Sequence, residues 1–118
     1  MNILVVDDDP DLCRMLSRYL EKQGFRVFSA GDALQALDVL GREQIQLVIT
    51  DYMMPHLDGI GFVTQLKADP TYKNVPVIMI TAHSTDELVD RGLRKGVAMT
   101  LSKPIDFDRL LTLVRFAQ

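Results

Sequence analysis

Residues 3–9 read ILVVDDD, and they carry the clearest structural signal in the chain. Four consecutive apolar residues are typical of a strand that is buried on both faces of a parallel sheet. Three carboxylates follow this run at once, and a fourth, Asp11, comes two residues after Asp9. The stretch therefore predicts a buried strand that ends in a concentration of negative charge.

Similar strand signals recur along the chain and alternate with segments of helical periodicity. The further predicted strands are residues 26–30, 45–50, 77–80 and 97–101. The helical stripes, which include Met15 and Leu93, fall within residues 12–20, 33–40, 60–67, 88–93 and 107–114. Gly24 and Gly96 are the expected helix ends. Five strands that alternate with five helices predict an α/β fold, a doubly wound parallel sheet with helices on both faces.

The composition is that of one globular domain. The chain has 118 residues, of which 47% are hydrophobic and 25% charged, so we expect a single domain over residues 1–118. No apolar run approaches the roughly 20 residues of a membrane span, and no signal peptide is evident. The net charge of −3 and the lack of a basic stripe argue against nucleic-acid binding. The single cysteine, Cys13, predicts a buried free thiol in a reducing cytoplasm.

Polar residues stand where the predicted strands end. The first strand ends in Asp7 and Asp8, the third in Asp51 and the fourth in Thr81, while Lys103 follows the fifth. Ligands of open α/β sheets bind at these carboxyl ends, so the five side chains are expected to converge. Three clustered carboxylates repel one another unless a cation lies between them, and an open all-oxygen site suits Mg²⁺. The sequence therefore predicts a magnesium site at this edge.

Not every acidic residue belongs to that site. Asp9 before Pro10 is typical of a helix N-cap with proline at the first helical position, and Asp11 favours the helix dipole. Lys103 precedes Pro104, and we predict a cis peptide bond there that directs the amine back toward the acidic edge. An ordinary β-branched strand residue remains the alternative interpretation of Thr81.

Four segments resemble the receiver domain of two-component response regulators, of the single-domain chemotaxis and sporulation type. They are ILVVDDD at 3–9, VITDYMMPHLDG at 48–59, MITAH at 79–83 and LSKP at 101–104. The resemblance covers essentially the whole chain in order. It implies a flavodoxin-like fold, a five-stranded parallel sheet of order 2-1-3-4-5 between five helices.

The resemblance also implies a phosphoacceptor and a cofactor. Asp51 would receive a phosphoryl group from a phospho-histidine of a sensor kinase or phosphotransfer protein. Asp8, Asp51 and the backbone carbonyl of Met53 would ligate Mg²⁺, and Asp7 would hold it chiefly through water. Such a module is not a conventional enzyme, since it catalyses only its own phosphorylation and dephosphorylation.

Two further residues acquire roles from the resemblance. Lys103 would pair with a phosphoryl oxygen, and Thr81 would donate its hydroxyl to another. Thr100 stands where the family usually has tyrosine or phenylalanine, which leaves that part of the switch open. His83 could be a catalytic base, but it is expected to be a variable rim residue. The regulated surface would be formed by the fourth helix, the fifth strand and the fifth helix. The partner would be a downstream protein, or a C-terminal output domain if the natural chain is longer.

Three other classes of protein are alternatives to this interpretation. A pseudo-receiver, an interaction domain without phosphoryl chemistry, is disfavoured by the intact set of polar residues. Phosphatases with an aspartyl nucleophile carry DxDx[TV], which Asp7-x-Asp9 begins, but the fifth position is Asp11. A nucleotide-binding enzyme would need a glycine-rich loop, and no glycine lies between Asp7 and Leu20.

Overall fold

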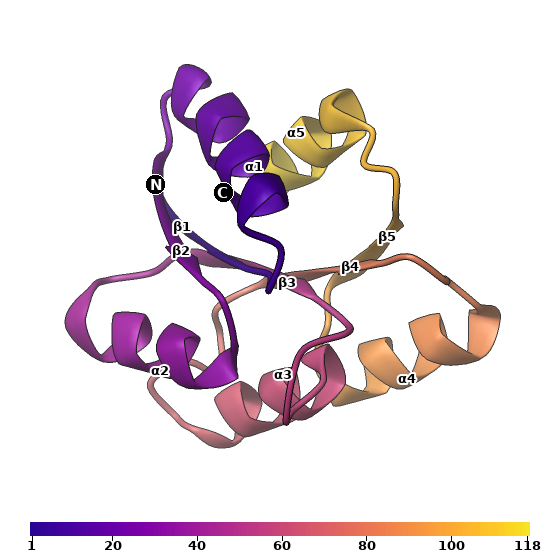
Figure 1. Ribbon diagram of the computed structural model, residues 1–118. Helices are drawn as coiled ribbons and strands as arrows, with labels where there is room; N and C mark the ends of the chain where they lie inside the picture. Colours follow the sequence, from indigo (N-terminus) through magenta and orange to yellow (C-terminus); the bar gives the residue numbers. More distant parts are fainter.

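The computed structural model describes residues 1–118, in which five strands alternate with five helices as predicted (Figure 1). The strands are β1 (Asn2–Val6), β2 (Arg26–Ala30), β3 (Leu47–Asp51), β4 (Val77–Thr81) and β5 (Met99–Ser102). The helices are α1 (Pro10–Lys22), α2 (Ala33–Arg42), α3 (Gly59–Ala68), α4 (Asp86–Lys95) and α5 (Phe107–Phe116). None of the helices has the length and apolar character needed to cross a bilayer.

The strands form one parallel sheet in the order β2-β1-β3-β4-β5. β1 lies between β2 and β3, so Val6 is opposite both Ala30 and Thr50. The strand order reverses between β1 and β3, because β2 lies on one side of β1 and the later strands lie on the other. A crevice at the carboxyl ends of β1 and β3 is where such sheets bind ligands. The predicted doubly wound fold of order 2-1-3-4-5 is confirmed.

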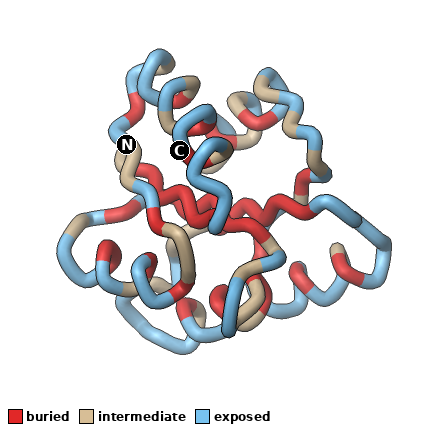
Figure 2. The backbone as a smooth tube through the Cα atoms, in the orientation of Figure 1, coloured by how far each residue is buried: buried red, intermediate tan, exposed pale blue.

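Helices cover both faces of the sheet, α1 and α5 on one side and α2, α3 and α4 on the other (Figure 1). Each side has its own apolar core, because successive strand residues point to opposite faces. Ile3 and Val5 pack in the core under α1 and α5, whereas Leu4 and Val6 pack in the core on the other side. Figure 2 shows the buried residues running along the sheet. Burial on both faces explains why β1 is apolar without interruption.

Each helix is preceded by a capping residue whose side chain accepts a hydrogen bond from a backbone N–H of the first turn. These caps are Asp9, Asp32, Asp58, Thr85 and Asp106. The predicted cap of α1 is confirmed, with Pro10 as the first helical residue and Asp11 in the first turn. Gly24, just beyond α1, and Gly96, at the end of α4, have positive φ angles of 94° and 107°, as chain reversals after helices require.

Two strands begin later than the apolar pattern predicts. β3 begins at Leu47 because Ile45, although buried, precedes the ladder. β5 begins at Met99 because the N–H of Val97 is used to close α4, donating to the carbonyl of Gly92 at 2.8 Å. An apolar side chain can therefore enter the core from a residue whose backbone is not yet part of the sheet.

Two residues assigned to buried helical stripes are exposed instead. Met15 is 54% exposed and Leu93 is 53% exposed. Each is adjacent in sequence to a buried position, Leu16 or Gly92, and a step of one residue turns about 100° around a helix. The contact faces of α1 and α4 are therefore narrower than the apolar pattern suggests. Cys13 lies on the contact face of α1 and is a buried free thiol, as predicted.

Candidate functional site

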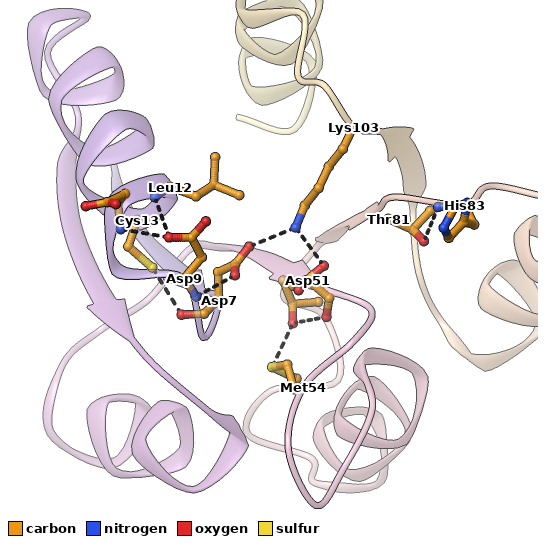
Figure 3. A network of polar contacts seen from close by, with 11 residues as sticks. Asp7, Asp9, Leu12, Cys13, Asp51, Met54, Thr81, His83 and Lys103 are labelled. Carbon is orange, nitrogen blue, oxygen red and sulfur yellow. Dashed lines mark hydrogen bonds and ion pairs between the residues drawn. The ribbon is translucent and has the colours of Figure 1, made fainter.

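The carboxyl edge of the sheet brings the predicted polar residues together. Asp7 directly follows β1, Asp51 and Thr81 are the last residues of β3 and β4, and Lys103 directly follows β5. Figure 3 shows the side chain of Lys103 reaching from the end of β5 toward Asp7 and Asp51. Asp8 lies beside them and is exposed to solvent. The geometry therefore joins the four charged residues into one cluster.

The ammonium group of Lys103 bridges two buried carboxylates. Its Nζ lies 3.3 Å from Oδ1 of Asp51 and 3.4 Å from Oδ2 of Asp7. Asp7 is 3% exposed and Asp51 is 5% exposed, whereas the side chain of Lys103 retains 28% of its exposure. The peptide bond between Lys103 and Pro104 is cis, as predicted. One cation thus faces two carboxylates that have little access to water.

Burial and mutual repulsion disfavour the charged forms of these carboxylates. Burial raises the pKa of Asp7 above its usual value, although the N–H of Asp9 and the charge of Lys103 oppose the shift. Burial and then repulsion from Asp7 raise the pKa of Asp51. For Lys103, burial lowers the pKa, but the carboxylates of Asp51 and Asp7 together raise it above its ordinary value. The cluster is therefore short of positive charge even with its lysine in place.

The three carboxylates fit a small divalent cation. One oxygen each from Asp7, Asp8 and Asp51 can be chosen so that all three lie within 4.8 Å of one another. All the donors are oxygen atoms, the kind that Mg²⁺ prefers, and the exposed side at Asp8 leaves room for the water ligands that this ion retains. The other two carboxylates, of Asp7 and Asp51, are buried and so would hold such an ion at a defined position.

The loop between β3 and α3 folds back closely over Asp51. The N–H of Gly59 donates to the carbonyl of Tyr52 at 2.7 Å, and a Cβ on Gly59 would lie 2.5 Å from the carbonyl oxygen of Asp51. Within this loop His56 has a positive φ of 70°, and Met53 exposes 66% of its surface. Glycine is therefore required at residue 59 for the loop to pack closely against the backbone of Asp51, a requirement that the sequence motif did not reveal.

Thr81 lies at the same edge but makes no hydrogen bond with the charged side chains. Its Oγ1 accepts a hydrogen bond from the backbone N–H of His83 at 3.2 Å (Figure 3). The N–H of Lys103 donates to the carbonyl of Thr81 at 2.8 Å, which ties the two residues through their backbones. Thr81 is buried, His83 is exposed, and Thr100 is half-buried opposite Met79. The hydroxyl proton of Thr81 is not used in the bond with His83, because that oxygen is the acceptor.

Sequence reasoning missed one contact of Cys13. Its thiol donates to the backbone carbonyl of Asp7 at 3.3 Å. Burial raises the pKa of Cys13 to about 11, so the group is a neutral donor at ordinary pH. The position of Cys13 four residues after Asp9 was the available signal, because it places the thiol on the first turn of α1, next to the end of β1.

The chain resembles known proteins along nearly its whole length. It matches the model of the family described as response regulator receiver domain over residues 3–115. It is 33% identical over 111 residues to the probable chemotaxis protein CheY of Rhizobium etli, covering 93% of this chain and 86% of that protein. It is 38% identical over 111 residues to the transcriptional regulatory protein ZraR of Klebsiella oxytoca, covering 93% of this chain and 24% of that protein.

A solved structure gives the same result for the fold. The chemotaxis protein CheY4 of Vibrio cholerae superposes with a TM-score of 0.94 and 28% identity, covering 99% of this chain and 98% of that one. The family match runs through the whole acidic edge, from Asp7 to Lys103. Receiver domains are signalling modules and not conventional enzymes. On the family match, the sheet order and the CheY relatives together, this chain belongs to the receiver domain family of two-component response regulators.

Proposed function

We propose that residues 1–118 work as one receiver domain that accepts a phosphoryl group on Asp51 in the presence of Mg²⁺. The main support is the pairing of buried Asp51 with Lys103, 3.3 Å away, beside two further carboxylates. Burying several charges is unfavourable, and a purely structural role would favour apolar residues at these positions. An acidic cluster that is buried at a cost in stability is best explained by a role in binding a cation and a phosphoryl group.

The proposed reaction is transfer from a phospho-histidine of a sensor kinase or phosphotransfer protein. A carboxylate oxygen of Asp51 attacks the phosphorus in line, so that an O–P bond forms while the P–N bond to the donor breaks. The donor nitrogen keeps the electron pair of that bond, and Asp51 becomes an acyl phosphate. Lys103 contacts Oδ1 of Asp51 and can offset the charge of the arriving phosphoryl oxygens.

The magnesium ligands proposed are Asp8, Asp51 and the backbone carbonyl of Met53, with Asp7 acting chiefly through water. When bound, Mg²⁺ supplies positive charge that offsets the phosphoryl oxygens. The carboxylate of Asp7 would add negative charge at a fixed position, because Lys103 contacts one of its oxygens at 3.4 Å. This division of roles agrees with the burial of Asp7 and the exposure of Asp8.

The proposed switch begins at Thr81. Oγ1 of Thr81 makes no hydrogen bond to Asp51, so donating to a phosphoryl oxygen there would require the side chain to turn toward Asp51, and this turn would release the N–H of His83 in the loop into α4. The backbone of Thr81 can stay in place meanwhile, because its carbonyl is held by the N–H of Lys103. Regulated partners are proposed to bind the surface formed by α4, β5 and α5.

A pair of variants tests the switch. Thr100 is small and stiff, so it offers little differential burial between two states, and Thr100→Ala is expected to change partner affinity by under about 1 kcal/mol. Thr81→Ala removes the hydroxyl and is expected to cost distinctly more. Isothermal titration of the beryllofluoride-bound variants against a phosphorylation-selective partner measures both. Equal losses would mean that Thr100 is an active part of the switch.

The proposed partners are a histidine kinase or phosphotransfer protein on the input side and a downstream protein on the output side. The chain spans 24% of the transcriptional regulator ZraR, so an output domain is the alternative if the natural chain is longer. We place this activity in the cytoplasm, and the single cysteine, Cys13, agrees with a reducing compartment. Neither nucleic acid nor membrane is a proposed direct ligand.

The deciding experiment is self-phosphorylation with a small donor. The protein is incubated with phosphoramidate or acetyl phosphate, with and without Mg²⁺, and its intact mass is measured. We expect the mass of one phosphoryl group to be added only with Mg²⁺, and not to the variant Asp51→Asn. Labelling of that variant, or labelling in excess EDTA, would contradict the proposal. Absence of any labelling of the wild type would favour a pseudo-receiver.

A further inference from the structure

The first turn of α1 holds Asp7 at two points. The backbone N–H of Asp9 donates to Oδ1 of Asp7 at 2.9 Å, and the thiol of Cys13 donates to the Asp7 carbonyl at 3.3 Å. The other carboxylate oxygen, Oδ2, faces Lys103 at 3.4 Å (Figure 3). Both oxygens of Asp7 are thus directed, one by a backbone donor and the other by a cation. Rotation of this carboxylate would break one contact or the other.

Asp9 has two roles in the same turn. While its N–H holds Asp7, its side chain caps α1, with Oδ1 accepting from the N–H of Asp11 at 3.0 Å and from that of Leu12 at 3.4 Å. The cap fixes the extended backbone of Asp9, with φ −91° and ψ 105°. Because this backbone carries the N–H that holds Asp7, the helix cap and the acidic edge are mechanically linked.

We propose that Asp9 is a positioning residue for the metal site, acting through Asp7 and not as a ligand. This inference rests on the proposed function, in which Asp7 takes part in binding Mg²⁺. Without the cap, the turn is free to move, the N–H of Asp9 no longer holds Oδ1, and the Asp7 carboxylate must be ordered when the ion binds. Ordering a group on binding lowers affinity, whereas a group that is already held does not incur this cost.

Three variants separate the cap of Asp9 from its charge. Asp9→Asn keeps a good N-cap and removes the charge, while Asp9→Ala removes both. Asp32→Ala is the matched control, because it removes one negative charge and the cap of α2, where Asp32 accepts from the N–H of Gln35 at 2.8 Å. No hydrogen bond links Asp32 to Asp7.

The measurement is the dissociation constant for Mg²⁺ alone, obtained by isothermal titration, with thermal unfolding in EDTA as the check on folding. We expect Asp9→Ala to bind about fivefold more weakly than Asp9→Asn, which is the ~1 kcal/mol of a lost cap converted at 1.4 kcal/mol per tenfold. Asp32→Ala is expected to remain within about twofold of the wild type. If Asp9→Ala does not fold, Asp9→Gly replaces it, because glycine removes the capping oxygen at little cost in stability.

Equal weakening in Asp9→Asn and Asp9→Ala would mean that Asp9 acts through its charge, and would overturn the inference. Unchanged affinity in Asp9→Ala, or an equal loss in Asp32→Ala, would overturn it as well. These results leave the proposed function intact, because the wild type still binds Mg²⁺. A wild type that does not bind Mg²⁺ at millimolar concentration would instead overturn both.

Discussion

Because Gly59 packs closely against the backbone of Asp51, adding a single methyl group at this position should destabilise the protein. In Gly59→Ala, the new Cβ would lie 2.5 Å from the carbonyl oxygen of Asp51 and 3.0 Å from the Cα of Tyr52. Ordinary van der Waals contact begins near 3.4 Å, so the loop or the end of β3 must move by about 0.9 Å. Both neighbours are backbone atoms, which cannot rotate away as a side chain would.

The expected magnitude combines two opposing effects. Overpacking costs typically about 1–3 kcal/mol, and the gain in helix propensity from glycine to alanine at the start of α3 returns up to about 1 kcal/mol. We therefore expect the free energy of unfolding to fall by about 1–2 kcal/mol. Gly41→Ala is the matched control in α2, where nothing lies within 4 Å of the new Cβ. That variant is expected to gain about 0.5–1 kcal/mol, the opposite sign.

Urea denaturation followed by circular dichroism, in EDTA, measures both variants against the wild type. The displaced Asp51 carbonyl should also slow self-phosphorylation by phosphoramidate in Gly59→Ala, whereas Gly41→Ala should react at the wild-type rate. If both alanine variants are stabilised, or if Gly59→Ala is phosphorylated normally, the backbone contact is not what positions the loop. The reasoning from the close approach would then be wrong.

Three other measurements test the charge cluster and its loop. Lys103→Ala leaves two buried carboxylates without their cation, so the free energy of unfolding at pH 7 in EDTA should fall by about 2–4 kcal/mol. The affinity for Mg²⁺ should be unchanged or tighter. Normal phosphorylation-dependent switching in this variant would contradict the role assigned to Lys103. Burial raises the folded-state pKa of Asp7 and Asp51 above their ordinary value of 3.8, so the folded protein binds more protons than the unfolded chain just above pH 4. The stability of the wild type relative to Asp51→Asn should therefore fall as pH rises from about 4 through the raised pKa values, as denaturation in metal-free buffer can measure. His56→Gly relieves a positive φ of 70° at an exposed residue and should raise the melting temperature, by the equivalent of about 0.5–1 kcal/mol; a lower melting temperature would show that the imidazole makes a stabilising contact.

Much of the site can be predicted from the sequence, because the carboxyl ends of parallel strands all lie at the same edge of the sheet. Placing Asp51 and Lys103 after apolar runs was enough to predict that they converge, and they lie 3.3 Å apart. The alternation of elements predicted helices on both faces, also correctly. The strand order came from the resemblance alone, since periodicity says nothing about which strands are neighbours. The distinction between candidate metal ligands and capping residues also followed from local sequence pattern, and Asp9 does cap α1.

The sequence could not predict interatomic distances to a fraction of an ångström, nor which residues of a helix face the sheet. The sequence around Gly59 does not distinguish an ordinary turn glycine from one that is needed because a backbone carbonyl oxygen packs closely against it. Met15 and Leu93 satisfy helical spacing yet face solvent, because a stripe covers more of a helix than the sheet contacts. The thiol of Cys13 was predicted to be buried, but its bond to the carbonyl of Asp7 depends on how α1 leaves β1.

The charge balance of the cluster connects this geometry to the proposed switch. Asp7, Asp8 and Asp51 with Lys103 carry a formal charge of about −2 when all are ionised, which one Mg²⁺ neutralises. A phosphoryl group on Asp51 replaces one negative charge with about two, so the site regains net negative charge at its centre. A nearby hydroxyl that can donate a proton is then attracted, and that of Thr81 is committed only as an acceptor from the loop into α4. We therefore propose that phosphorylation changes the hydrogen bond from His83 in that loop, and that this change would carry the signal from Asp51 to the α4 surface.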